Sequence, residues 1–326
     1  MNVLVIGGSG LIGGKTVLRL LNEAAISKVV SMDVISPKPW LMKRYLQCGD
    51  KFAYFRGSVA DLENIMDAVN IHDINRIINL AFILPGEVEA DPRLSVKVNL
   101  LGTCNAFEAA RLAGIRRVIY ASSEGVYGPQ DEYGDREVRE DDVLHPGSAY
   151  ALGKQMSEVL AAQYTERYGI RFTALRPATC FGHGGKNPRE IKLFSELVSL
   201  PAAGKPFVIE DDGTDRYSLF TPDDIGEIIT LILKTGAPRH DVYNVGSPSY
   251  SLRDVAGVVK KYIPDADIRF GEIPPPFDRG KTGIPWRISG ERAKKEFGFT
   301  VKPLEESVGI HINDARMEAG YEPIQV

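Results

Sequence analysis

The fold of this chain is decided by the stretch Asn2–Gly13, which reads NVLVIGGSGLIG. Its first five residues, Asn2–Ile6, form a short run that is apolar from Val3 on and rich in branched side chains, which is typical of a strand buried on both faces of a parallel sheet. After the glycines, an apolar pattern of helical period predicts a helix from Leu11 through Leu21. A glycine turn between a strand and a helix lets backbone N–H groups approach a diphosphate at the positive end of the helix. The stretch therefore predicts the first strand, turn and helix of a dinucleotide-binding sheet.

A second predicted strand, Val29–Asp33, ends in a carboxylate. At this position of a dinucleotide-binding unit, an acidic side chain hydrogen-bonds the hydroxyls of the adenosine ribose. Its negative charge would repel a 2′-phosphate, and no arginine follows it directly, so the sequence predicts NAD rather than NADP. The alternative is that Asp33 only caps a loop.

Strand and helix patterns then continue to alternate up to residue 122. The expected elements are a strand Phe52–Phe55, a helix Asp61–Val69, a strand Arg76–Ala81, a helix Pro92–Ala113 and a strand Arg117–Ser122. Repeated strand–helix units with short connections predict an α/β fold with a doubly wound parallel sheet.

Composition narrows the class of protein. A net charge of -4 over 326 residues gives no basic stripe, which argues against a nucleic-acid partner and against a membrane surface. No charged leader precedes the first strand, and no apolar run reaches the ~18 residues of a transmembrane helix. The cysteines Cys48, Cys104 and Cys180 and the histidines lack metal-site spacing, so we predict no metal and reduced thiols in a cytoplasmic protein.

Two further segments carry candidate proton-transfer chemistry. In the helix predicted to start near Ser148, Tyr150 and Lys154 are four residues apart and so lie on the same face. A lysine ammonium beside a phenol lowers the tyrosine's pKa toward the range of a general base. Ser123 follows a strand at the sheet edge where ligands bind, and is placed to meet Tyr150. The alternative is a half-buried aromatic beside a solvated lysine.

Taken together, these features resemble the extended short-chain dehydrogenases/reductases, also called the NAD-dependent epimerase/dehydratase family. The resemblance covers nearly the whole chain. It rests on the order of the motifs Gly7/Gly10/Gly13, Asp33, Asn99 within NLLGT, Ser123 before Tyr127-Gly128, Tyr150/Lys154 and Arg176-Pro177. It implies a Rossmann fold with a smaller carboxyl-terminal α/β substrate-binding region, and NAD as the cofactor.

The resemblance also implies roles for individual residues. Tyr150 would exchange a proton with the substrate oxygen, Ser123 would hydrogen-bond that oxygen, and Lys154 would hold the nicotinamide ribose. Asn99 would orient this catalytic set. The expected cofactor contacts are Gly7, Gly10, Leu11, Ile12, Gly13, Asp33, Ser58, Val59, Leu80, Ala81, Tyr150, Lys154 and Pro177.

For the substrate, we expect contacts from Ser123, Glu124, Thr179 and Arg216. Dehydratases of the family place two adjacent acids after the catalytic hydroxyl, whereas Gly125 follows Glu124 here, so we do not expect dehydration. Glu124 is then either an auxiliary acid or base, or a solvated loop carboxylate. Arg216 either binds a phosphate or carboxylate of the substrate or is a surface arginine.

The carboxyl-terminal half divides between two regions. We expect residues 1–176 to form the NAD-binding domain, to which 218–246 return, and residues 177–217 and 247–326 to form the substrate-binding region. Arg279 and Arg287 are further ligand candidates, and the prolines Pro274–Pro276 mark a possible lid. Expected elements are helices Pro222–Leu233, Ser251–Tyr262, about Ser289–Phe297 and Leu304–Ala319, and a strand Val242–Val245.

Three functions remain open from the sequence. The leading one is an NAD-dependent oxidoreductase that transfers hydride at a secondary alcohol or ketone of a sugar-like or other polar substrate. The second is a UDP-sugar 4-epimerase, and the third is a non-catalytic NAD-sensing module, which the complete Ser/Tyr/Lys set disfavours. The family commonly pairs the helices around Leu100–Ala113 and Tyr150–Tyr168 across a dimer, so we expect a homodimer acting on a small molecule.

Overall fold

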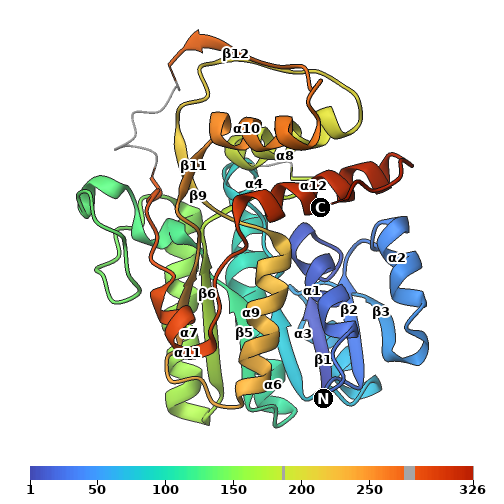
Figure 1. Ribbon diagram of the computed structural model, residues 1–326. Coiled ribbons are helices and arrows are strands. Elements are labelled where there is room, and N and C mark those ends of the chain that lie inside the picture. The colour runs from blue at the N-terminus through green and yellow to red at the C-terminus, as the bar shows by residue number, and fades with distance from the viewer. Residues whose placement is uncertain (186–187, 275–282, 326) are drawn as a thin grey trace.

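The computed structural model describes residues 1–185, 188–274 and 283–325. Its centre is a seven-stranded parallel sheet with the order β10-β6-β5-β4-β1-β2-β3 (Figure 1). The strand order reverses between β1 and β4, and ligands of such sheets bind at the carboxyl ends of the strands around that point. The strands are β1 (Asn2–Ile6), β2 (Lys28–Asp33), β3 (Phe52–Arg56), β4 (Arg76–Asn79), β5 (Arg117–Ala121), β6 (Arg171–Pro177) and β10 (Val242–Val245).

Helices cover both faces of this sheet, which confirms the predicted doubly wound α/β fold. Successive strand residues point to opposite faces, so Val3 and Val5 enter one apolar core while Leu4 and Ile6 enter the other. The first core is covered by α1 (Leu11–Leu21), α2 (Pro39–Leu46), α9 (Pro222–Thr235) and α11 (Glu291–Phe297), and the second by α3 (Leu62–Ile71), α6 (Gly102–Leu112) and α7 (Ala149–Tyr168).

The long helix predicted over Pro92–Ala113 is interrupted. The chain forms the short helices α4 (Pro85–Ala90) and α5 (Pro92–Ser95), then a π-helical turn at Val96–Leu101, and only then α6. A π turn inserts a residue into the helical repeat, which periodicity does not reveal, and such turns often lie at functional sites. In this turn Asn99 turns inward and bonds both backbone groups of Ile83.

The rest of the chain forms a smaller α/β region above the sheet, built around a third apolar core (Figure 1). Helix α10 starts directly after Ser251, whose hydroxyl accepts a hydrogen bond from the backbone N–H of Asp254, as the sequence predicts. The region contains β7 (Thr179–Cys180), α8 (Arg189–Ala202), β8 (Phe207–Asp211), β9 (Arg216–Phe220), β11 (Ser249–Ser251), α10 (Leu252–Tyr262), β12 (Ile268–Ile273) and α12 (Leu304–Glu318).

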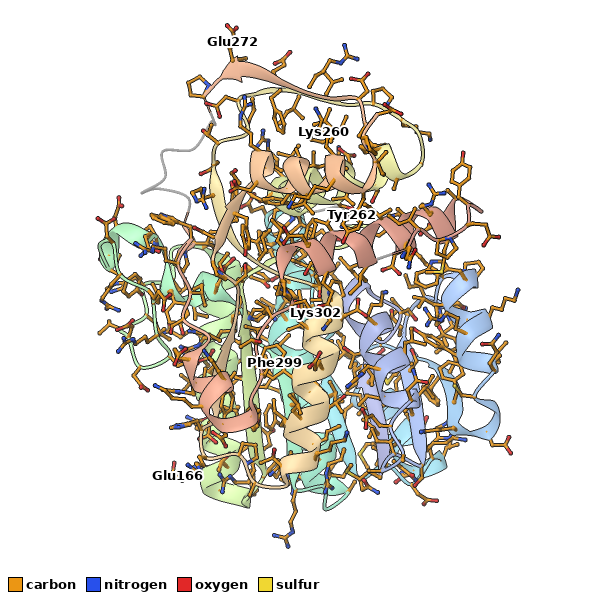
Figure 2. The ribbon with its side chains drawn as sticks, in the orientation of Figure 1. Glu166, Lys260, Tyr262, Glu272, Phe299 and Lys302 are labelled. Atoms are coloured by element: carbon orange, nitrogen blue, oxygen red, sulfur yellow. The ribbon has the colours of Figure 1, made fainter. Side chains whose placement is uncertain are left out.

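The connection back to the sheet passes through α9 and β10. Strand β10 pairs in parallel with β6, from Val242 opposite Ala174 to Val245 opposite Pro177. In the segment before α12, Lys302 lies against α9 (Figure 2). Its Nζ is 2.9 Å from Glu227 Oε2 and 3.4 Å from Asp224 Oδ1.

Two expectations lie outside the described residues. The proposed lid falls largely on residues 275–282, as does Arg279.

Within the described residues, no helix combines the length and the hydropathy that crossing a bilayer requires.

Candidate active site

The turn between β1 and α1 lies directly against the end of β4. Gly7 has φ +79°, and a Cβ on it would come 2.7 Å from the backbone nitrogen of Ala81. A Cβ on Gly13 would overlap the carbonyl oxygen of Gly7. Only glycine fits both positions, so the tightness of the turn explains its composition.

This turn fits a dinucleotide diphosphate. Helix α1 has no acidic residue in its first turn, so its positive end is not neutralised by its own side chains. The Ser9 hydroxyl beside it is buried and has no hydrogen-bond partner among the described residues. Gly7, Gly10, Leu11, Ile12, Gly13 and Leu80 line a cavity of roughly 300 Å³ at this edge. Backbone donors, an orphaned hydroxyl and space are therefore present where NAD phosphates are expected.

Asp33 stands at the end of β2, as predicted. Its Oδ2 accepts from the backbone N–H of Ser9 at 3.0 Å, and its Oδ1 accepts from that of Ile35 at 3.3 Å. The carboxylate therefore does cap a loop, but each oxygen keeps a lone pair and the side chain stays partly exposed. The capping and ribose-binding interpretations are thus compatible.

Ser58 and Val59, the expected adenine contacts, follow β3. The Ser58 hydroxyl accepts from the N–H of Ala60 at 3.2 Å, while Val59 is buried against Gly102. Both are held by these local contacts. Whether they contact adenine stays a prediction.

Ser123 and Tyr150 meet as the sequence predicts. Ser123 follows β5, and its hydroxyl hydrogen-bonds Tyr150, which stands in the first turn of α7. That helix begins at Ser148, whose hydroxyl accepts from the N–H of Ala151 at 3.2 Å. Burial raises the pKa of Tyr150, and the Ser123 hydrogen bond lowers it only in part. The expectation of a depressed tyrosine pKa is therefore wrong for the free protein, because desolvation dominates.

Lys154 points toward the same place without bonding the phenol. Its Nζ lies 5.6 Å from the centre of the Tyr150 ring and 3.8 Å from that of Phe82, and it donates to the carbonyl of Ala121 at 2.6 Å. Burial lowers the pKa of Lys154 to about 7, while the Glu158 charge opposes that shift. The lysine is thus poised to change charge near neutral pH.

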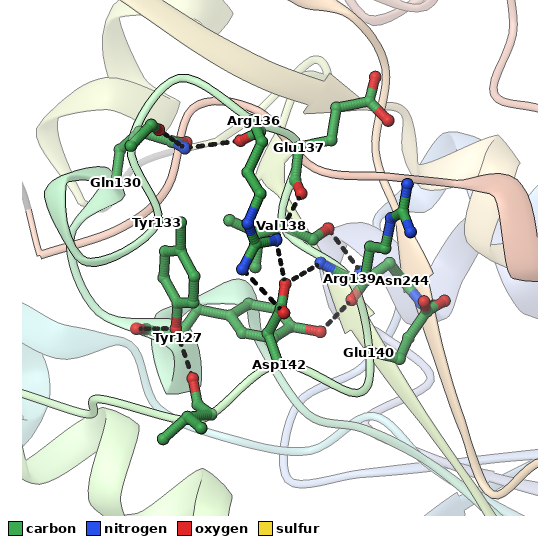
Figure 3. Close-up of polar contacts among 12 residues, drawn as sticks. Tyr127, Gln130, Tyr133, Arg136, Glu137, Val138, Arg139, Glu140, Asp142 and Asn244 are labelled. Atoms are coloured by element: carbon green, nitrogen blue, oxygen red, sulfur yellow. Dashed lines mark hydrogen bonds and ion pairs between the residues drawn. The ribbon is translucent and has the colours of Figure 1, made fainter.

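Glu158 anchors a buried polar network behind the catalytic residues. It accepts from the Ser122 hydroxyl at 2.5 Å and from Arg176 Nε at 2.9 Å and Nη2 at 2.6 Å. Arg176 Nη1 in turn donates to the Tyr127 phenol at 2.8 Å. That phenol donates to Asn244 Oδ1 at 2.7 Å (Figure 3). The network joins β5, α7, β6 and β10 and fixes the strand end that carries Ser123.

The loop between Gly128 and Gly147 is held by the same network. Asn244 donates its backbone N–H to Glu140 Oε1 at 3.0 Å, and the Tyr133 phenol bonds the carbonyls of Tyr127 and Val143, each at 2.7 Å. Figure 3 shows Arg136 closing the loop through Asp142, with Nη1 to Oδ2 at 2.7 Å. This loop therefore presents a fixed wall to the site.

In front of the catalytic residues lies a cavity of roughly 620 Å³. Glu124 lines it and is only 4% exposed, so the interpretation as a solvated loop carboxylate is wrong. Its Oε1 accepts from the Thr179 hydroxyl at 3.1 Å. Other lining residues are Phe82, Ser123, Tyr150, Pro177, Glu190 and Ile191.

Arg216 is not among the described residues that line this cavity. Arg216 stands on β9, and its guanidinium donates to the carbonyl of Ser249 on the neighbouring strand β11. It also forms an ion pair of 3.2 Å with Asp254 in α10. Asn99 is also not part of that wall, and acts through Ile83, next to the Phe82 ring that covers Lys154. Arg287, another candidate, bonds the carbonyl of Asp135.

Sequence reasoning missed Phe82, Glu158 and Glu190. Glu158 had a signal, because it follows Lys154 by one helical turn on the same face. Phe82 comes from the segment after β4 and Glu190 from the first turn of α8, and their meeting at the site depends on the assembled fold rather than on a local pattern.

Comparison with known proteins agrees with this geometry. The model of the NAD dependent epimerase/dehydratase family matches residues 3–246, which is most of the chain. The chain belongs to this family. It is therefore an NAD-dependent enzyme, and NAD is its cofactor.

Relatives in the epimerase/dehydratase family differ in activity. UDP-glucose 4-epimerase of Mycolicibacterium smegmatis is 31% identical over 257 residues, 76% of this chain and 77% of that protein. D-erythronate dehydrogenase of Cupriavidus necator is 28% identical over 215 residues, 63% of each protein. A trifunctional UDP-glucose 4,6-dehydratase, epimerase and reductase of Arabidopsis thaliana is 27% identical over 84% of this chain, which spans only 42% of that relative.

Among solved structures, MoeE5 in complex with UDP-glucuronic acid and NAD is 26% identical, with a TM-score of 0.76. The alignment covers 98% of this chain and 100% of MoeE5. The similarity thus extends through the smaller carboxyl-terminal region, beyond the residues that the family model matches.

Proposed function

We propose that this protein is a dehydrogenase that acts at a secondary alcohol, or the corresponding ketone, of a sugar-like or other polar substrate. The observation that carries the proposal is the hydrogen bond between Ser123 and Tyr150 on the wall of the 620 Å³ cavity, with Lys154 one helical turn away. Two hydroxyl donors that converge on one point stabilise the negative charge that develops on a substrate oxygen.

Tyr150 acts as the general acid and base in this proposal. Because burial raises its pKa, the phenol keeps its proton in the free protein and is ready to protonate a ketone oxygen. In the oxidative direction the phenol first releases its own proton to solvent, which the Lys154 charge favours, and the phenolate then takes the proton of the alcohol. Bound NAD supplies the hydride acceptor or donor. Asn99 is a positioning residue that holds the segment carrying Phe82.

The cofactor contacts follow the same proposal. The glycine turn would hold the diphosphate, Asp33 the adenosine ribose, and Lys154 the nicotinamide ribose. The remaining NAD contacts would come from Leu11, Ile12, Ser58, Val59, Leu80, Ala81, Tyr150 and Pro177.

The test is the substitution Tyr150→Phe. We expect turnover to fall on the order of 10²–10⁴-fold, as when a general acid–base group is lost, while NAD still binds. NADH formation would be followed with sugars, sugar acids and hydroxy-ketones. Tyr164→Phe is the matched control, because Tyr164 stands on the same helix and bonds Glu108 instead. Near-normal turnover of the Tyr150 variant would remove this residue from its role.

The second candidate is a UDP-sugar 4-epimerase, which the identity to the Mycolicibacterium smegmatis enzyme favours. Epimerisation leaves no net redox change, so tightly retained NAD(H) without NADH release would identify it. The position of Arg216, tied to Ser249 and Asp254 away from the cavity wall, supports the dehydrogenase instead.

We extend the proposal to organisation and location. Residues 1–176 with 218–246 form the NAD-binding domain, supported by the pairing of β10 with β6, and 177–217 with 247–326 form the substrate-binding region.

Exposed apolar side chains on α7, Leu152, Met156 and Val159, support a homodimer, which light scattering would test. Three free cysteines support a reducing, cytoplasmic location.

A further inference from the structure

One carboxyl group in the cavity has an unused hydrogen-bonding position. Glu124 Oε1 accepts from Thr179, but Oε2 is fully buried and has no partner among the described residues. Buried polar atoms are rarely left unpaired, because an atom taken out of water without a partner loses its hydrogen bonds and destabilises the folded protein. The side chain lines the cavity that also contains Ser123 and Tyr150, so a ligand there is the available partner.

The backbone holds Glu124 in this place. A 3-10 helix, Glu124–Tyr127, starts directly after the catalytic strand, and the Ser123 hydroxyl accepts from the N–H of Gly125 at 3.0 Å. This capped turn fixes the backbone of Glu124, and the hydrogen bond from Thr179 holds its side chain. It also lies close enough to Tyr150 for a charge on it to raise the pKa of that phenol. The unpaired oxygen therefore lies beside the reacting group.

The surroundings of Glu124 favour the neutral, protonated form of its carboxyl group. Burial raises the pKa of Glu124 well above its usual range, the Thr179 hydrogen bond opposes the shift, and nearby Glu190 increases it. A neutral carboxyl group has one O–H donor, and no described residue takes its proton. The missing partner is accordingly an oxygen acceptor on the ligand.

We propose that the substrate is a neutral vicinal diol or polyol, whose second hydroxyl, next to the reacting one, accepts a hydrogen bond from the neutral Glu124 carboxyl oriented by Thr179. This inference rests on the proposed function, since it takes Tyr150 as the mark of the reacting carbon. Glu124 is a specificity-determining residue here and takes no part in the hydride or proton transfer. An alcohol with a methyl group in place of the second hydroxyl would leave the carboxyl group unpaired and would bind on the order of 10- to 100-fold more weakly.

Binding can be measured apart from chemistry. All proteins would carry Tyr150→Phe, so that bound alcohol is not consumed, and would be saturated with NAD. The probes are 2,3-butanediol, the isosteric 3-methyl-2-butanol and the cationic 3-amino-2-butanol, titrated by calorimetry. Each is compared in proteins with native Glu124, with Glu124→Gln and with Glu124→Leu. Glutamine keeps a neutral donor at the same place, whereas leucine keeps only the volume.

The expected result is a preference for the diol over 3-methyl-2-butanol of at least tenfold with native Glu124. The preference should stay within about threefold of that value in Glu124→Gln and disappear in Glu124→Leu. Tightest binding of the amino alcohol, lost equally in both variants, would overturn the proposal, because it would indicate an ionised carboxylate. Equal binding of the diol and 3-methyl-2-butanol to native Glu124, or absence of diol binding, would overturn it as well.

The two proposals fail in different ways. If the dehydrogenase proposal is wrong, the protein with native Tyr150 forms no NADH from any alcohol, yet the diol preference and its dependence on Glu124 persist. If the inference on Glu124 is wrong, NADH formation depends on Tyr150 as proposed, but the Glu124 variants show unchanged diol preference.

Discussion

Two buried carboxyl groups lie on opposite sides of the Ser122-Ser123 strand end, and they differ in how they are paired. Behind the strand, both oxygens of Glu158 are occupied by Ser122 and Arg176. In front of it, Glu124 has one oxygen on Thr179 and the other without a partner. A fully satisfied buried network fixes structure, whereas an unsatisfied group costs stability and is retained for a ligand. Pairing, rather than burial, thus separates scaffold from site.

The largest expected effect comes from replacing Glu158, the carboxylate whose two oxygens are both paired. Glu158→Gln leaves Arg176 buried without a counter-charge, and we expect a loss of about 3–5 kcal/mol in the free energy of unfolding. Urea denaturation followed by circular dichroism measures it. Glu196→Gln is the matched control, since its pair with Lys192 is exposed and 3.7 Å long, and should change stability by less than about 0.5 kcal/mol. If Glu158→Gln and Glu196→Gln lost similar amounts of unfolding free energy, the Glu158 network would not be a special source of stability.

Replacement of Glu124 should have the opposite effect on stability: it should stabilise the folded protein at neutral pH rather than destabilise it. The pKa of Glu124 is raised in the folded state, so between its unfolded value near 4.5 and its folded value the native chain holds a proton that the unfolded chain has lost. Stability of the native sequence therefore falls as pH rises through that window, by up to about 1.4 kcal/mol per pH unit. Glu124→Gln removes this slope, so we expect the variant to gain stability relative to the native protein as the pH rises from 5 to 7.

Denaturation midpoints at pH 5, 6, 7 and 8 test this expectation. Glu196→Gln again serves as the control, because its carboxylate is exposed and lies outside the cavity. A stability difference between Glu124→Gln and the native protein that does not change with pH would show that Glu124 is ionised in the folded protein.

The smallest expected effect concerns the hydroxyl that orients Glu124. Thr179→Val keeps the shape and removes the 3.1 Å hydrogen bond, at a cost of about 1 kcal/mol. In a Glu124→Leu background the same substitution should cost almost nothing, and the difference is the coupling energy of the pair. Equal costs in the two backgrounds would mean that Thr179 acts independently of Glu124.

Much of the fold followed from local patterns. Strand β1, helix α1 and strand β10 have their predicted bounds, because buried parallel strands and amphipathic helices carry strong periodic signals. The π-helical turn around Asn99 was missed, since an inserted residue changes no composition. The meeting of Ser123 with Tyr150 was predictable because both stand in elements whose ends meet at one sheet edge.

The electrostatic details were not predictable from spacing. The raised pKa of Tyr150 and the burial of Glu124 depend on side chains from the segment after β4, from β7 and from α8 that close over the site, and no local pattern encodes that closure. The same limit applies to Arg216, whose partners Ser249 and Asp254 are brought to it by the pairing of β9 with β11.

The late return of β10 to the sheet has a consequence for synthesis. Strand β6 cannot acquire its outer neighbour until residue 245 has been made, roughly 70 residues after β6 ends, which takes about 3–14 s at ribosomal rates. During that interval the nascent sheet presents an open row of backbone N–H and C=O groups along β6, a template for pairing with another chain. The first part of the smaller region, residues 177–217, is thus translated while the larger region is still unfinished, and the rest of it follows only after β10.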